Sequence, residues 1–209
     1  MNRRKFIEYS IKTIALASVP VINFFPKVNI SEDEKKLPWS SNTFKFPLEN
    51  FKLQSGEILK HAFLLVDVNG ELNQSKSNAI IFATCFAGSH KFNQMAYGIN
   101  RALNPLKYCI ITPNLFCSGY SSSPSNTNSP QDGPRFPSVT YYDNINAQNK
   151  LITKYFGITN PLMYLGFSMG AQQAFHWGAL HGEKTGGIIP LCGTAKTTTQ
   201  NWITLEGCK

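Results

Sequence analysis

The pentapeptide Gly166-Phe167-Ser168-Met169-Gly170 fits the pattern G-x-S-x-G. In this pattern a serine lies on a sharp turn between a strand and a helix, and its hydroxyl projects from the end of a sheet. Such a turn explains Gly166 and Gly170, because side chains at both positions would clash across it. The residue types therefore predict that Ser168 is a nucleophile. The alternative is that so short a pattern has arisen by chance in a glycine-containing loop.

A serine nucleophile also needs donors for the oxyanion that forms when it attacks a carbonyl group. One expected donor is the backbone N–H of the residue after the nucleophile, here Met169. The second is expected from the loop after the third strand. We assign it to Phe86, within Cys85–Ser89. The alternative is that Gly88 in this segment only serves a turn.

The base and the acid that would complete a catalytic triad have no clear candidates. In this arrangement both follow the nucleophile, with the acid first. The acids and histidines considered are Glu183, Glu206, His176 and His181 after the serine, and His61 and His90 before it. His176 would lie about 12 Å along the helix from Ser168, beyond hydrogen-bond reach. His90 is interpreted as a pocket or surface residue, so we find no triad in this sequence.

Strand and helix signals alternate around the pentapeptide. The apolar run Pro161–Leu165 predicts a buried strand, and Met169–Leu180 predicts a helix. Further strands are expected at 44–53, 58–69, 79–84, 108–112 and 187–193, and further helices at 93–103 and from Thr140 or Asp143 to about 156. This order predicts an α/β fold with a mostly parallel sheet and helices on both faces. The segments 44–53 and 58–69 form an antiparallel hairpin at its edge.

The composition is that of an ordinary globular protein, with 42% hydrophobic and 15% charged residues. The net charge of +8 is scattered over the body of the chain without a basic stripe, which argues against a nucleic-acid partner. Five cysteines occur at irregular spacing without a C-x-x-C pair, so no metal site is expected and we interpret them as buried thiols. The long Ser/Pro-rich segment from Pro113 to Pro137 is expected to be functional or mobile.

The N-terminus resembles an export signal. Arg3-Arg4-Lys5-Phe6-Ile7 is followed by a mostly apolar stretch, Ile14–Phe25, too short to span a bilayer comfortably. The arginine pair is typical of the twin-arginine signal for export of folded proteins. We therefore divide the chain into a leader (1–30), a linker (31–43) and a folded domain (44–209). The alternative for the leader is a cytoplasmic tail.

An ordered set of motifs makes the chain resemble homoserine O-acetyltransferase-like α/β-hydrolases from about Phe51 to Lys209. The motifs are Ala83–His90, Pro113–Phe116, Ser121–Thr127, Asp132–Pro137, Gly166–Gln173 and Leu191–Ala195. The resemblance implies acyl transfer through a covalent acyl-serine to an alcohol, or to water in hydrolytic relatives. It implies Ser168 as nucleophile and Met169 and Phe86 as oxyanion donors. No cofactor is implied; acyl-coenzyme A is a candidate substrate, and the full-length family suggests a homodimer.

The resemblance covers only the N-terminal portion of the family. The cap, the last strands and the loops with the acid and the histidine would follow Lys209, so we expect a C-terminally truncated α/β-hydrolase fold that is inactive by itself. The alternative is a non-catalytic remnant or a binding module with the same partial fold. An exported protein would meet little acyl-coenzyme A, so a working leader favours an esterase over an acetyltransferase.

Overall fold

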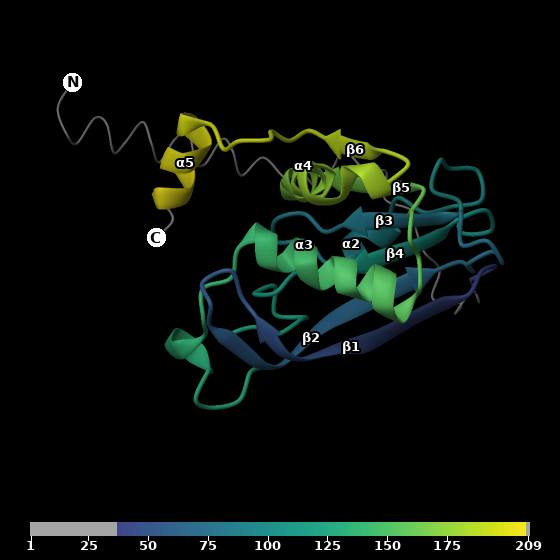
Figure 1. The fold of residues 1–209 in the computed structure, drawn as a ribbon. Coiled ribbons are helices and arrows are strands. Elements are labelled where there is room, and N and C mark those ends of the chain that lie inside the picture. Colours follow the sequence, from purple (N-terminus) through teal and green to yellow (C-terminus); the bar gives the residue numbers. More distant parts are fainter. Residues whose placement is uncertain (1–36, 208–209) are drawn as a thin grey trace, which may run out of the picture. The chain divides into compact units, whose positions relative to one another are not determined.

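The computed structural model describes residues 37–207, and the expected leader lies outside this range. Six strands form one sheet in the order β1-β2-β4-β3-β5-β6 (Figure 1). Their bounds are β1 Ser41–Lys52, β2 Ile58–Asn69, β3 Ala79–Ala83, β4 Cys109–Pro113, β5 Met163–Phe167 and β6 Ile188–Leu191. The pairs β4–β3, β3–β5 and β5–β6 are parallel. Strand β2 pairs antiparallel with both β1 and β4. The mostly parallel α/β sheet expected from the sequence is confirmed.

The antiparallel hairpin of β1 and β2 contains an irregularity that keeps its apolar side chains on one face. Leu59, Ala62, Leu64 and Val66 are all buried, although Leu59 and Ala62 are three residues apart. A regular strand would place them on opposite faces. Between them His61 adopts φ 49°, and the register shifts near Glu49 on the partner strand. This bulge lets the apolar side chains before and after it face the same side, so both parts of β2 contribute to the core.

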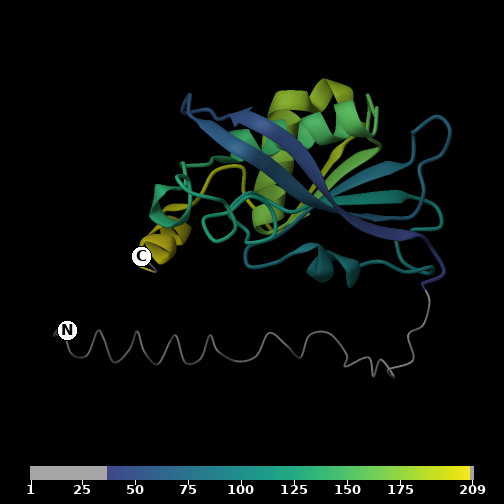
Figure 2. The same cartoon turned by 90° about the horizontal axis from the view of Figure 1, so that it is seen from below.

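Helices cover both faces of the sheet (Figure 2). On one face lie α3 (Tyr141–Lys150) and α4 (Met169–His181), which pack on strand residues such as Ile81 and Tyr164. On the other face, α2 (His90–Gln94) and the turns after it cover Ile80, Phe82, Ile110 and Leu165. The strands β3 and β4 are therefore buried on both sides, which explains their continuous apolar sequences.

The helix expected at 93–103 is wrong in both length and position. Only His90–Gln94 is helical, and the chain then turns so that the Gly98 N–H donates to the Leu103 carbonyl. The Asn93 side chain donates to the carbonyls of Phe82 and Ala83. These contacts depend on the folded sheet and override the local helical pattern.

Helix α3 begins with a capping box. The Thr140 hydroxyl accepts from the Asp143 N–H, and the Asp143 carboxylate accepts from the Thr140 N–H. The helix ends in a π-helical turn at Leu151–Tyr155. The expected helical segment to about 156 is thus present, and Thr140 rather than Asp143 is its cap. Asp143 is buried and also accepts from the Gln54 N–H at 2.6 Å, which fixes α3 to the hairpin.

The interpretation of the cysteines as buried thiols is wrong for part of the set. Cys109 on β4 is buried, and burial raises the pKa of its thiol to about 12. Cys85 is half-buried, whereas Cys117 and Cys192 are exposed because they lie in the loops after β4 and β6. Cys208 lies outside the described residues.

After β6, a loop leads to α5 (Thr199–Glu206). No helix within residues 37–207 is long and apolar enough to cross a bilayer.

Candidate active site

Ser168 lies at the junction of β5 and α4 in a strained backbone conformation. Its φ is 54° and its ψ is −116°, values that residues other than glycine adopt only when the surroundings enforce them. The Ser168 N–H donates to the Leu191 carbonyl at 2.8 Å, and its carbonyl accepts from the Ala171 N–H at 2.9 Å. These bonds fix the turn on both sides. Within the described part of the chain, no group is hydrogen-bonded to the Ser168 hydroxyl, so it is available for reaction.

Gly166 and Gly170 lie against each other across this turn. A Cβ at Gly166 would lie 1.9 Å from the Gly170 carbonyl oxygen. A Cβ at Gly170 would lie 2.9 Å from the Ala83 carbonyl oxygen, at the end of the neighbouring strand. The first glycine permits the turn, and the second lets the start of α4 approach β3.

The two backbone groups expected to stabilise an oxyanion line the same cavity. Met169 is the first residue of α4. Phe86 lies in a turn closed by a hydrogen bond from the Gly88 N–H to the Cys85 carbonyl, in which Ala87 adopts φ 54°. Neither the Met169 N–H nor the Phe86 N–H donates to another group within residues 37–207. Both N–H groups thus have no acceptor in the described part of the chain.

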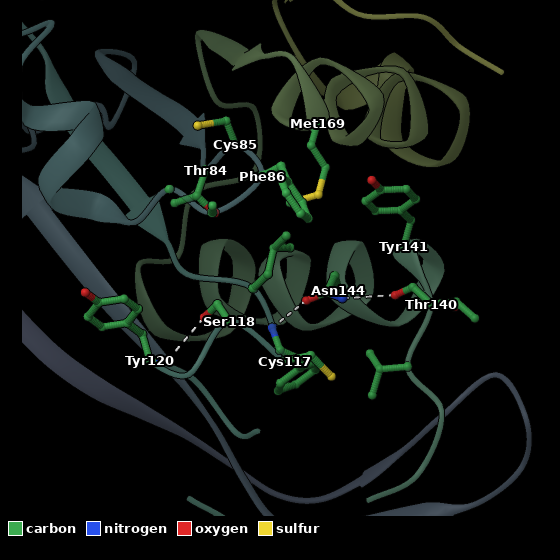
Figure 3. Close-up of a pocket in the computed structure, with 15 residues that line it drawn as sticks. Thr84, Cys85, Phe86, Cys117, Ser118, Tyr120, Thr140, Tyr141, Asn144 and Met169 are labelled. Atoms are coloured by element: carbon green, nitrogen blue, oxygen red, sulfur yellow. Dashed lines mark hydrogen bonds between the residues drawn. The ribbon is translucent and has the colours of Figure 1, made fainter. Parts of the chain in front are cut away.

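The cavity beside these groups has a volume of about 660 Å³ and a largely apolar wall. Figure 3 shows Phe86 and Met169 at one end of it and Cys117 and Ser118 at the other. Its lining is Thr84, Cys85, Phe86, Ala87, Gly88, Leu115, Phe116, Cys117, Ser118, Tyr120, Val139, Thr140, Tyr141, Asn144 and Met169. None of these residues is charged. Ser168 itself is not one of them, but it directly precedes Met169.

The start of α3 forms one wall of the cavity, which sequence reasoning missed. The Asn144 side chain accepts from the Phe116 N–H at 2.8 Å, and its amide donates to the Thr140 carbonyl. The Tyr141 hydroxyl donates to the Gln172 side chain on α4 at 2.7 Å, and burial raises the pKa of Tyr141. The signal that could have found this wall is the capped helix start directly after the long loop, since loops at the carboxyl ends of parallel strands form binding sites.

The histidines are engaged elsewhere. The His176 ring packs against Tyr141, with ring centroids 5.2 Å apart, and the His181 ring packs edge-on against Trp177. The interpretation of His90 as a pocket or surface residue is wrong: it is buried, and its Nδ1 lies 3.3 Å from the Asn114 side-chain oxygen. His61 lies in the β2 bulge and is exposed. Among residues 37–207, no histidine is hydrogen-bonded to Ser168.

The described residues contain no group of three or more His, Cys, Asp or Glu side chains that could hold a metal ion. The groups that could take part in a reaction are therefore the half-buried Ser168, whose hydroxyl has no hydrogen-bond partner among the described residues, two N–H groups without acceptors and an uncharged cavity. The model of the family described as alpha/beta hydrolase fold matches residues 78–206. The chain belongs to the α/β-hydrolase fold family.

Relatives of this α/β-hydrolase include both esterases and acetyltransferases. The chain is 39% identical to ethyl acetate hydrolase of Pseudomonas veronii over 155 residues, which cover 74% of this chain and 44% of the relative. It is 32% identical to homoserine O-acetyltransferase of Methanosarcina acetivorans over 178 residues, covering 77% of this chain and 32% of that protein. The resemblance found in the sequence is confirmed by these matches.

A solved structure of an acetylester hydrolase from Corynebacterium glutamicum superposes on this α/β-hydrolase with a TM-score of 0.77 and 33% identity. The superposition covers 79% of this chain and 48% of the other. The matched part of the chain thus spans about a third to a half of the length of these relatives.

Proposed function

We propose that this chain carries the nucleophile and the oxyanion donors of a serine-dependent acyl-transfer enzyme. The observation that carries the proposal is the strained Ser168 backbone between β5 and α4, with φ 54° and ψ −116°. A ψ of −116° at this φ lies outside the left-handed helical region that some non-glycine residues adopt, and backbone strain of this kind clusters at active sites. The free N–H groups of Met169 and Phe86 beside the same cavity support it.

In the proposed reaction, the Ser168 hydroxyl oxygen attacks the carbonyl carbon of an ester, and its proton passes to a base. The carbonyl oxygen becomes an oxyanion that accepts hydrogen bonds from the N–H groups of Met169 and Phe86. The oxyanion collapses, and the alcohol leaves with a proton from the base. An acyl-serine remains. Attack by water then releases the acid and restores the serine; attack by another alcohol would complete a transfer instead.

Between these outcomes, the cavity favours hydrolysis of a small uncharged ester. Homoserine carries an ammonium and a carboxylate group, and coenzyme A carries phosphates. Burial of such charges against a wall without charged residues would cost several kcal/mol per unpaired ion. The wall around Phe86, Met169 and Tyr141 offers no charged partner. We therefore propose an acetylester-like substrate rather than an acyl-coenzyme A and amino-acid pair.

We further infer that the base comes from polypeptide outside these 209 residues. The residues His90, His176 and His181 are held by Asn114, Tyr141 and Trp177 and do not contact the serine. A second chain or a longer form of this one would supply the missing histidine and acid. The alternative is a non-catalytic module, in which the serine is never acylated.

A fluorophosphonate probe tests the proposal when it is applied to two proteins. One is the 209-residue chain. The other is a chimera that joins it to the portion of the Pseudomonas veronii relative that it does not match. We expect labelling of Ser168 in the chimera, none in its Ser168→Ala variant, and hydrolysis of ethyl acetate without acetyl transfer from acetyl-coenzyme A to homoserine. A folded chimera that resists the probe would support the non-catalytic module. Rapid turnover by the 209-residue chain would refute the inference about the base.

Export remains a separate proposal. The twin-arginine-like leader favours a location outside the cytoplasm, where an esterase could act without acyl-coenzyme A. A reporter fused to residues 1–43 should be carried out of the cytoplasm. The same fusion with Arg3 and Arg4 replaced by lysine should stay in the cytoplasm. Complete retention of the unmodified fusion contradicts export.

A further inference from the structure

We propose that Gln173 is a positioning residue that fixes the spacing between the two oxyanion donors. The inference rests on the proposed function for its meaning, but its structural content can be tested separately. Gln173 lies on α4, five residues after Ser168, and is completely buried. Its side-chain amide donates to the Thr84 carbonyl oxygen at 2.8 Å. Thr84 follows β3 directly and precedes the turn that contains Phe86.

The hydrogen bond from Gln173 joins the two segments that carry the donors. Met169 and Gln173 are one turn apart on the same helix, so they move together as part of α4. Thr84 and Phe86 are two residues apart on the loop after β3. A bond of 2.8 Å between the helix side chain and the loop backbone therefore limits how far the Phe86 N–H can shift relative to the Met169 N–H.

Gln173 is itself oriented by a chain of buried side chains. Its carbonyl oxygen accepts from the Gln148 amide on α3 at 3.1 Å, and the Gln148 oxygen accepts from the Tyr164 hydroxyl on β5 at 2.6 Å. Gln148 and Tyr164 are also fully buried. Because each oxygen is occupied by a donor, the amide of Gln173 is fixed with its N–H groups toward Thr84. The network therefore fixes both the position of the Gln173 side chain and the orientation of its amide group.

The local packing shows why the bond is needed. Gly170 brings α4 so close to β3 that an added Cβ would lie 2.9 Å from the Ala83 carbonyl and 3.3 Å from the Thr84 carbonyl. This close approach places the Ala83 and Thr84 carbonyls directly against the start of α4. On the other face of the sheet, Asn93 donates to the Phe82 and Ala83 carbonyls. Gln173 alone among the described residues donates to Thr84, the carbonyl nearest the Phe86 turn.

Acyl-transfer catalysis is sensitive to this spacing. The donors must both lie within hydrogen-bond distance of one oxygen atom that moves as the carbonyl carbon becomes tetrahedral. A shift of about 1 Å in such a group can lower a rate about a hundredfold. A residue that never touches substrate can therefore control the rate of acylation without changing how tightly the ester binds.

The experiment compares two buried glutamines in the 209-residue chain. Gln173→Met removes the bond to Thr84, and the matched control Gln148→Met breaks the same network one step farther away. The reporter is exchange of the Gly88 amide proton, which is protected by its bond to the Cys85 carbonyl within the Phe86 turn. We expect Gln173→Met to speed this exchange about tenfold through loss of one supporting hydrogen bond. In Gln148→Met the Gln173 amide should still donate to the Thr84 carbonyl, because a flipped amide would set two oxygens against each other, so exchange should change less than twofold at a similar loss of thermal stability.

A second measurement is the carbonyl ¹³C chemical shift of Thr84. This shift should change in Gln173→Met and stay unchanged in Gln148→Met. Unchanged Gly88 exchange in Gln173→Met would overturn the proposal, and so would equal acceleration in both variants. These measurements need no catalysis, so they remain decisive for Gln173 even if Ser168 of the folded chimera fails to react with the probe, the result that would refute the proposed function. In an active chimera, Gln173→Met should lower kcat about tenfold or more with KM within twofold. A rise in KM alone would count against positioning.

Discussion

Replacement of Gly166 by alanine should disrupt the turn that carries the serine. The new Cβ would lie 1.9 Å from the Gly170 carbonyl oxygen and 2.1 Å from its carbonyl carbon. Real Cβ atoms are essentially never closer than 3.0 Å to another heavy atom, so a shift of about 1 Å is required. The obstacle is backbone at the start of α4, which cannot rotate away as a flexible side chain could.

The cost in stability follows from this geometry. Added methyl groups in a well-packed core cost about 1–3 kcal/mol, and occasionally more. Because the collision at Gly166 is with backbone, we expect a loss at the upper end, about 3 kcal/mol of the free energy of unfolding. For a domain of this size that corresponds to a fall in Tm of about 6–12 °C. The shift of α4 should also abolish reaction of Ser168 with the fluorophosphonate probe in an active form.

Gly182→Ala is the matched control. No atom lies within 4 Å of the Cβ position at Gly182, and its φ of −58° suits alanine. The same methyl group is added there without a collision, so we expect a gain of about 0.4–1 kcal/mol from the less flexible unfolded chain. Urea unfolding followed by tryptophan fluorescence, to which the buried Trp177 contributes, measures both variants. Equal unfolding midpoints for Gly166→Ala and Gly182→Ala would refute the steric argument.

Three further predictions test the strain, the buried network and a histidine. Ser168→Gly should raise the free energy of unfolding by about 1–2 kcal/mol, because glycine tolerates this backbone, while Ser168→Ala should not; equal melting of the two would contradict strain at this position. Tyr164→Phe should lower stability by about 1–3 kcal/mol in urea unfolding, because the Gln148 oxygen loses its buried donor; an unchanged midpoint would contradict that bond. Burial, aided by Lys184, lowers the pKa of His181 below 6.5, so the unfolded chain binds more protons just below that pH. Stability should then rise as pH increases through the window that ends near 6.5, and His181→Gln should flatten this slope in melts at a series of pH values; an equal slope would exclude His181 as its source.

Much of the fold was predictable because its strands are marked by local patterns. The apolar alternation of 58–69 and the continuous run at 79–83 identify the edge hairpin and a central strand directly. The segment after His90 was not predictable in the same way. Its apparent helical pattern yields to contacts of Asn93 with β3 and of Gly98 with Leu103, which exist only once the sheet has formed. Local propensity determines the secondary structure only of segments in which long-range contacts do not compete with it.

The candidate site likewise contains residues whose positions the local sequence predicts and contacts that only the folded structure reveals. The positions of Ser168, Met169 and Phe86 could be predicted from sequence because each occupies a fixed place relative to a strand end, whereas their roles in a reaction stay predictions. The cavity wall at the start of α3 and the bond between Gln173 and Thr84 could not, since they join residues far apart in sequence. Gln173 and Thr84 are separated by 89 residues, and nothing in either local sequence reveals the other.

Strand β6 shows how a sheet edge can be apolar and still be a poor template for pairing. The Tyr164 N–H donates to the Gly187 carbonyl and the Ser168 N–H to the Leu191 carbonyl, so residues 187, 189 and 191 face β5. Because backbone groups alternate sides along a strand, Ile188 and Pro190 face the open edge. Pro190 has no N–H, so within β6 only Ile188 can donate there. The half-exposed apolar side chains of Ile189 and Leu191 favour association, but the proline limits the ladder that a neighbouring strand could form. A strand that extends this sheet must therefore rely on side-chain packing more than on backbone hydrogen bonds.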